Sequence, residues 1–122
     1  FMKERLFDPL GMKDTGFHVP PEKIGRFATS YMMNHETGVP EIYDPAEGGS
    51  WSEPPVFPAA ASGLVSTVDD CCAFFRMLLS KGAYRGGRIL SSESVAMMTT
   101  DQLTVAQKAD NAIFFGGHSG WG

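Results

Sequence analysis

Seven of the eight prolines in this 122-residue chain fall between residues 18 and 58, together with Gly38, Gly48 and Gly49. Proline has no backbone N–H and interrupts helices and central strands, so most of this stretch is predicted to be loop. A loop of this length is uncommon in a compact domain unless it is functional or wraps another part of the protein. We therefore expect that some of its packing partners lie outside this sequence.

Within this stretch, one short strand is predicted around Phe27–Met33, with the sequence "FATSYMM". It is expected to pair with "PEIY", because Gly38 in "NHETGVP" suits a hairpin-like turn. The aromatic residues of the same stretch, Tyr43, Trp51 and Phe57, can be interpreted either as cleft residues or as anchors that hold the loop on a core.

The strongest helix signal follows, in "STVDDCCAFFRMLLSKG". Its apolar positions follow a 3.6-residue period, which predicts one buried face made of Val68, Cys71, Cys72, Phe75, Leu78 and Leu79. Ser66 or Thr67 can cap the start, with Asp69 or Asp70 placed as in a capping box. Gly82 marks the other end.

Two weaker helices flank this one. The first begins at Phe1 and is expected to end near Asp8, because the residue before Pro9 is disfavoured in the α region. Gly11 then takes a positive φ in a compact turn. The second is predicted from Ser91 or Ser92 to about Thr99.

The remaining local predictions concern the C-terminal half. The second weak helix is expected to bury Val95 and Met98, and "YRGGRIL" reads as a turn that leads into a short extended piece. Residues 101–112 are ambiguous, and residues 113–122 are predicted to enter a strand. The pairs Met32–Met33 and Met97–Met98 are interpreted as core fillers.

Composition excludes several classes of protein. With 43% hydrophobic residues, 20% charged residues and a net charge of −4, the chain is typical of a soluble globular protein. No basic stripe is present to bind nucleic acid, and no apolar run approaches the roughly 20 residues that span a bilayer. We expect neither partner, and we identify no signal peptide.

Metal and disulfide chemistry are not expected either. His18, His35 and His118 are scattered, and no Cys or His pair has the spacing of metal ligands. Cys71 and Cys72 are adjacent within a predicted helix, where a bridge would be strained, so both are predicted to be free thiols. Free thiols weakly favour a reducing compartment, and no localisation is assigned from the sequence. No cofactor is expected.

A search for a catalytic nucleophile finds no local signature. The chain contains no G-x-S-x-G elbow and no S-x-x-K. Ser66 and Thr67 could act as nucleophiles at a helix start, but the acidic residues behind them would oppose an oxyanion, which favours a capping role. Ser62, within "AAASG", fits a pocket wall or an ordinary tight turn. His118 could be a general base or a structural histidine.

The segments "RLFDPLGMKDTGF", "VPPEK", "SGLVSTVDDCCAFFRMLLSKG", "GGRILSSESVAMMTTDQL" and "GGHSGWG" follow one another along the chain. In this order they resemble the serine β-lactamase-related family, which includes class C β-lactamases, D-alanyl-D-alanine carboxypeptidases and family VIII esterases. The resemblance covers nearly the whole chain. Together, the D-T-x-F turn after "PLG" and the later G-L-x-S-T-x-x-D are quite specific.

The resemblance implies a covalent acyl-enzyme mechanism. In the family, the serine of S-x-x-K attacks a carbonyl, and the lysine and the tyrosine of a Y-x-N motif handle protons. Both motifs precede "PLGM" in chain order, and this sequence contains neither, since Tyr31, Tyr43 and Tyr84 are not followed by the required asparagine. "HSG" at 118–120 imitates the third motif, but "GGHSGWG" more closely resembles the strand before it.

By resemblance, the substrate-binding residues are therefore Ser62 and Gly63, as part of the wall of the active-site cleft. The chain opens inside an apparent helix and closes on a glycine-rich, strand-like run. We interpret residues 1–122 as a single partial domain, the α+β middle segment of a β-lactamase/transpeptidase-like fold, built mainly of helices and long loops with a few short strands.

Two functional hypotheses follow. In the first, the parent protein is a serine hydrolase of esters, amides or β-lactams, and this chain alone is inactive. The chain's partner is then the remainder of the parent fold. In the second, the chain is a non-catalytic helical binding or self-assembly module, because faces that the parent buries would be exposed and would find a partner.

Overall fold

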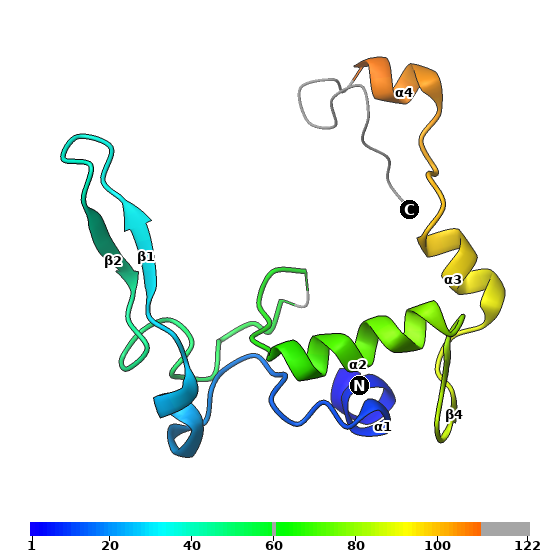
Figure 1. The fold of residues 1–122 in the computed structure, drawn as a ribbon, viewed down its shortest axis with the longest axis horizontal. Helices are drawn as coiled ribbons and strands as arrows, with labels where there is room; N and C mark the ends of the chain where they lie inside the picture. The colour runs from blue at the N-terminus through cyan, green and yellow to red at the C-terminus, as the bar shows by residue number, and fades with distance from the viewer. Residues whose placement is uncertain (60, 111–122) are drawn as a thin grey trace. The chain divides into compact units, whose positions relative to one another are not determined.

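The computed structural model describes residues 1–59 and 61–110 (Figure 1). It divides the chain into two compact units, Phe1–Cys71 and the part that begins at Cys72. The first unit contains η1 (Lys3–Phe7), α1 (Asp8–Leu10), η2 (Pro21–Arg26), β1 (Ser30–Met33) and β2 (Pro40–Asp44). Helix α2 (Val68–Leu79) runs across the division, and β3 (Ala83–Tyr84), β4 (Gly87–Arg88), α3 (Ser92–Met98) and α4 (Val105–Asp110) follow.

The N-terminal helix continues past the predicted end at Asp8. Asp8 keeps right-handed helical angles, φ −62° and ψ −47°, and the helix runs to Leu10. Its preceding turn is π-helical, with the Asp8 N–H bonded to the Lys3 carbonyl. This wider turn accommodates the ring of Pro9, which a regular α-helix could not. Gly11 ends the helix at φ +69°, as predicted.

Strands β1 and β2 form the predicted antiparallel hairpin. Gly38 adopts φ +69° in the connecting turn, and the Asn34 side chain accepts hydrogen bonds from the N–H groups of Glu36 and Thr37. The observed strand begins at Ser30, three residues later than predicted. Tyr31 faces Ile42 and Met33 faces Pro40, whereas Tyr43 is an extra residue at a bulge. Local turn chemistry therefore builds this hairpin.

Helix α2 lies over the predicted residues, and Thr67 begins it. The Asp70 N–H donates to Thr67 Oγ1 at 3.3 Å, which selects Thr67 over Ser66 as the cap. At the other end, the Gly82 N–H bonds to the Met77 carbonyl and the Lys81 N–H to the Leu78 carbonyl. In this Schellman arrangement Lys81 takes the left-handed position at φ +54°, and Gly82 follows at φ +87°.

The predicted buried face of α2 is not the face that is buried. Val68 is 80% and Leu79 84% exposed, and Cys72 and Phe75 are exposed as well. The most buried side chain is Met77, at 1%, and Asp70 is also buried. The helix carries apolar residues on more than one side, so periodicity alone could not tell which side packs within these residues.

In the second unit, β3 and β4 form a minimal hairpin. The turn and the extended piece predicted for "YRGGRIL" correspond to residues 85–86 and to β4, and β3 is an additional short strand that was not predicted. Helix α3 has the predicted bounds, and Ser91 caps it by accepting the Ser94 N–H at 3.0 Å. Val95 is buried as predicted, but Met98 is 48% exposed. Helix α4 occupies part of the range that the sequence left ambiguous.

Several apolar side chains expected in a core lie on the surface. Met32, Met33 and Met97 are exposed, as are Tyr43 and Phe57, so the core-filler and loop-anchor interpretations are wrong for these residues. The methionine pairs lie on a hairpin and a short helix that have too few neighbours in the described residues to enclose them. Trp51 is half-buried, and its carbonyl accepts the Val19 N–H at 2.7 Å.

Some predictions fall outside the described residues, namely the strand over 113–122 and the role of His118. Within the described part of the chain, Cys71 and Cys72 are free thiols and no cluster of side chains could hold a metal ion. None of the helices in that part of the chain combines the length and the apolar composition that a membrane span requires.

Candidate functional site

The segment that carries Ser62 and Gly63 begins with a tight backbone turn. The Gly63 N–H bonds to the Ala59 carbonyl at 2.7 Å, and the Ser62 N–H reaches the same oxygen at 3.4 Å. A Cβ atom on Gly63 would lie 2.6 Å from that oxygen, so only glycine fits without moving the backbone. Ser62 itself is exposed. The turn thus presents the Ser62 hydroxyl to solvent.

A short β-bridge fixes the chain immediately after this turn. Gly16 and Val65 exchange two backbone hydrogen bonds, of 3.1 Å and 2.9 Å. Next to the bridge, Thr15 Oγ1 and Ser66 Oγ lie 2.8 Å apart and form a hydrogen bond. The "DTGF" turn and the "GLVST" segment, about fifty residues apart in sequence, are therefore fastened along their backbones and side chains.

Asp70 completes this attachment from the first turn of α2. Its Oδ2 accepts the Asp14 N–H and the Thr15 hydroxyl, each at 2.8 Å. The side chain is only 7% exposed, so these bonds satisfy a carboxylate that water cannot reach freely. We call Asp14, Thr15, Ser66 and Asp70 the Asp70 clamp. The clamp was not predicted from the sequence, because the position of Asp70 indicated only a capping role.

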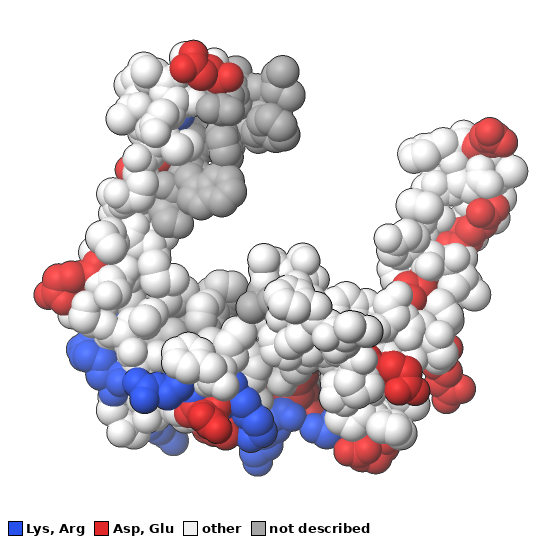
Figure 2. Space-filling view, turned by 180° about the vertical axis from the view of Figure 1, so that it is seen from behind, with Lys and Arg blue, Asp and Glu red and all other residues white. Residues whose placement is uncertain are grey.

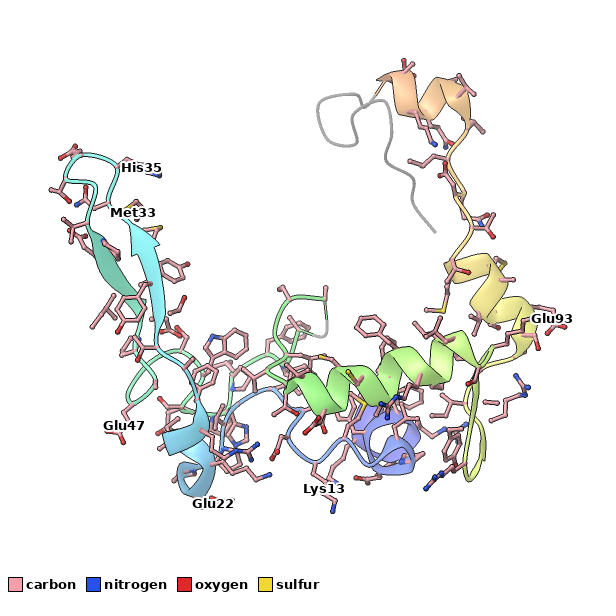
Figure 3. The ribbon with its side chains drawn as sticks, in the orientation of Figure 1. Lys13, Glu22, Met33, His35, Glu47 and Glu93 are labelled. Atoms are coloured by element: carbon pink, nitrogen blue, oxygen red, sulfur yellow. The ribbon has the colours of Figure 1, made fainter. Side chains whose placement is uncertain are left out.

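Asp14 links the Asp70 clamp to η2. Its carboxylate accepts Lys23 Nζ at 2.6 Å and Arg26 Nη1 at 2.9 Å. The hydrogen bonds from Lys23 and then from Arg26 hold the pKa of the Asp14 carboxyl below its ordinary value. Lys23 also donates to the Lys13 carbonyl at 2.9 Å, so the turn is held at two places. Figure 3 labels Lys13 and Glu22, which lie on this turn and on η2.

A hollow of about 860 Å³ lies beside the clamp, within the first unit. Its apolar lining includes Phe7, Met12 and Phe27, and Thr15, Lys23 and Ser66 contribute polar groups. Ser62 and Gly63 are not among the lining residues. The two predicted wall residues and the hollow are thus separate features of the same unit.

The hydroxyls near the start of α2 are engaged in structure. Thr67 Oγ1 accepts the Asp70 N–H, and Ser66 Oγ contacts Thr15 Oγ1 and accepts the Cys71 thiol at 3.5 Å. No lysine or histidine in the described residues hydrogen-bonds to either hydroxyl, so neither has the base that a serine or threonine nucleophile needs. This geometry supports capping and clamping over catalysis.

A family model described as "Beta-lactamase" matches residues 1–122. The chain belongs to the Beta-lactamase family. This match agrees with the resemblance of the "PLGMKDTGF" and "SGLVSTVDD" segments to the serine β-lactamase-related proteins. These two segments are the ones that the Asp70 clamp joins.

Proteins similar to this member of the Beta-lactamase family are found among both sequences and structures. Protein Rv1367c of Mycobacterium tuberculosis is 43% identical over 105 residues, which cover 86% of this chain and 25% of that protein. The uncharacterized protein MT1414 from another strain of that organism matches equally well. The chain thus spans about a quarter of the length of the curated relatives it matches.

Two solved structures show the fold. The octameric penicillin-binding protein homologue from Pyrococcus abyssi matches with a TM-score of 0.56 and 24% identity, over 85% of this chain and 20% of that one. A variant of simvastatin synthase (LovD) from Aspergillus terreus matches with a TM-score of 0.62 and 20% identity, over 89% and 25%. The predicted α+β class, as part of a β-lactamase/transpeptidase-like fold, is confirmed.

Proposed function

We propose that these residues form a scaffold segment of an acyl-enzyme serine hydrolase that acts on esters, amides or β-lactams. Ser62 and Gly63 then belong to the wall of its active-site cleft. The observation that carries the proposal is the attachment of the "GLVST" segment to the "DTGF" turn through the Asp70 clamp and the Gly16–Val65 bridge. The wall of a cleft must keep its position when substrate binds, and these contacts fix the backbone of the "GLVST" segment.

We further propose that the 122-residue chain has no hydrolase activity of its own, because it contains no S-x-x-K motif. The test is labelling with a fluorescent fluorophosphonate and with a fluorescent penicillin. Both probes are applied to this chain and to a protein extended along its gene in both directions. We expect only the longer protein to be labelled. Labelling of the short chain, lost on Ser62→Ala or Ser66→Ala, would contradict inactivity.

The wall role of Ser62 is tested in the longer protein by Ser62→Trp. The indole would project from the Ala59–Gly63 turn into the proposed cleft and obstruct bulky acyl groups. We expect the ratio of penicillin labelling to p-nitrophenyl acetate hydrolysis to fall about tenfold, equivalent to ~1.4 kcal/mol of discrimination. Ser80→Trp places the same indole at an exposed serine just after α2. An equal ratio in the two variants would remove Ser62 from the wall.

A second candidate function is self-assembly without catalysis. It is favoured by the exposed apolar side of α2, where Val68, Phe75 and Leu79 have no cover within the described residues. The Pyrococcus abyssi homologue is octameric, which gives a precedent for assembly in this fold. Light scattering separates the two candidates, since a strictly monomeric chain would count against assembly.

A further inference from the structure

The β1–β2 hairpin carries a surface that the proposed hydrolase chemistry does not use. In its register, Tyr31 lies opposite Ile42 and Met33 opposite Pro40, so these four side chains share one face. Tyr31 is 63% and Ile42 61% exposed. Figure 3 labels Met33 on this hairpin and His35 at its tip. A two-stranded hairpin with an exposed apolar face is only marginally stable in water by itself.

The two outer edges of this hairpin differ. Strand β2 begins with Pro40, which cannot donate a hydrogen bond, and is interrupted by the bulge at Tyr43. Both features discourage pairing with another strand. Strand β1, "SYMM", has no proline, no charge and no bulged residue. Among the described residues, no third strand pairs with it.

The direction of the backbone donors on β1 follows from one hydrogen bond. The Asn34 N–H donates to the Val39 carbonyl at 3.0 Å, across the hairpin. Successive N–H groups of a strand point to opposite edges, so the N–H groups of Met33 and Tyr31 point away from β2. Within the part of the chain that the structure describes, strand β1 therefore offers two backbone donors that have no partner, beside exposed apolar side chains.

The charged side chains of the hairpin, Glu36, Glu41 and Asp44, have one sign. The sequence has no Lys or Arg between Arg26 and Arg76, and the hairpin and the loop after it contain Glu36, Glu41, Asp44, Glu47 and Glu53. Figure 2 shows acidic and no basic side chains along the hairpin on the face drawn. Figure 3 labels Glu47 in the loop that follows β2. A second copy of the chain would bring the same negative charges to the edge, and so would nucleic acid or an anionic membrane.

We propose that β1 binds an extended segment of another polypeptide, in which apolar residues alternate with Lys or Arg, by adding it to the hairpin as a third strand. Main-chain hydrogen bonds from Tyr31 and Met33 supply the pairing. The apolar residues of the segment cover the face of Tyr31 and Ile42, and its cations face the acidic side chains. This inference does not depend on the proposed hydrolase function.

Some of the acidic groups are available for this contact. Asp44 holds the loop after β2, because its Oδ1 accepts the Ser50 N–H at 2.9 Å and the Ser50 hydroxyl at 3.1 Å. Glu41 accepts one hydrogen bond from Asn34 Nδ2 at 2.8 Å and retains a second carboxylate oxygen. A cation could therefore bind the second carboxylate oxygen of Glu41 without breaking the hydrogen bonds between Asp44 and Ser50.

The test uses a fluorescein-labelled hexapeptide of alternating lysine and valine, titrated with the 122-residue chain and followed by fluorescence anisotropy. We expect saturable binding that weakens as ionic strength is raised past ~0.15 M, where surface charges are screened beyond about 8 Å. The matched peptide of alternating glutamate and valine is expected to bind at least about tenfold more weakly. Equal binding of the two peptides would overturn the proposal.

Two pairs of variants separate edge pairing from charge. Met33→Pro removes an outward donor and should weaken binding about tenfold relative to Met33→Ala, which keeps the N–H. Glu41→Lys should weaken it about fivefold relative to Glu22→Lys, which makes the same charge change on η2. Loss of the Tyr31–Ile42 contacts in NMR spectra would show that Met33→Pro unfolds the hairpin. In that case the comparison of Glu41→Lys with Glu22→Lys still tests the proposal. Unchanged affinity in Glu41→Lys, or a dimer that competes with the peptide, would contradict a basic partner.

Discussion

Asp70→Ala is expected to destabilise the chain by about 3 kcal/mol. Asp70 Oδ2 accepts the Asp14 N–H and the Thr15 hydroxyl, each at 2.8 Å, and the side chain is 7% exposed. Truncation removes a charged acceptor and leaves the Asp14 N–H without a partner in a half-buried turn. The side-chain attachment between the "DTGF" turn and the start of α2 is then reduced to the Thr15–Ser66 hydrogen bond. Urea unfolding followed by circular dichroism measures the change.

Asp69→Ala is the matched control for this variant. Asp69 precedes Asp70 in the same first turn of α2 and is exposed, so its removal takes the same charge away from the helix N-terminus. We expect a loss of at most about 1 kcal/mol. Asp70→Asn retains an acceptor oxygen and should fall between the two. Equal destabilisation by Asp69→Ala and Asp70→Ala would show that only the helix-terminal charge matters and that the clamp contributes nothing.

The elements that the sequence predicted well are those set by neighbouring residues. Thr67 begins α2 and Ser91 begins α3 through hydrogen bonds that reach only three residues along the chain. The hairpin turn likewise depends on Asn34 and Gly38, which lie within a few residues of each other. A short window of sequence is enough to detect such signals, because the donor and the acceptor of each hydrogen bond lie within a few residues of each other.

Long-range attachments were not predictable in the same way. Asp70 and Asp14 are separated by 56 residues, and nothing local distinguishes a carboxylate that clamps a distant turn from one that only caps its own helix. The resemblance to the serine β-lactamase-related family identified both segments but gave no information about contact between them. The signal that could have found the clamp was the presence of two polar motifs, "DTG" and "STVDD", in which hydroxyls and carboxylates could satisfy each other.

The incorrect prediction of the buried face of α2 has a different cause. Phe75 and Leu79 satisfy the helical period as well as Met77 does, so apolar side chains occupy more than one side of this helix. Within the described residues Met77 is buried and Leu79 is not. A helix with apolar residues on several sides requires more than one neighbour. Within the described residues no such neighbour covers the exposed side of α2, and in the proposed parent protein further elements would cover it.

Gly82→Ala is expected to destabilise the second unit by about 3 kcal/mol, through two separate effects. Gly82 adopts φ +87°, where an L side chain costs roughly 1–2 kcal/mol. In addition, a Cβ atom there would lie 2.0 Å from the Leu90 carbonyl oxygen and 2.7 Å from its carbon. These are backbone atoms, which cannot rotate aside as the end of a side chain could.

The backbone around Gly82 explains why the strain would spread. The Gly82 carbonyl accepts the Ile89 N–H at 2.9 Å, and the Gly82 N–H closes the end of α2 on Met77. Leu90 directly precedes Ser91, the cap of α3. Displacing Leu90 therefore disturbs the end of one helix and the start of the next. We expect faster amide exchange at Ile89 and at Ser94, whose N–H bonds to Ser91.

Two other glycines separate the contributions. Gly11→Ala tests the backbone angle alone, because Gly11 has φ +69° but no atom within 4 Å of the position that a Cβ would occupy, and about 1 kcal/mol is expected. Gly25→Ala has neither a positive φ nor a neighbour and should be neutral or slightly stabilising. If Gly82→Ala costs no more than Gly11→Ala in thermal unfolding, the close approach of Leu90 to Gly82 does not constrain the fold. A larger cost, with exchange increased at Ser94, assigns the excess to that approach and makes Gly82 the residue that couples the end of α2 to the start of α3.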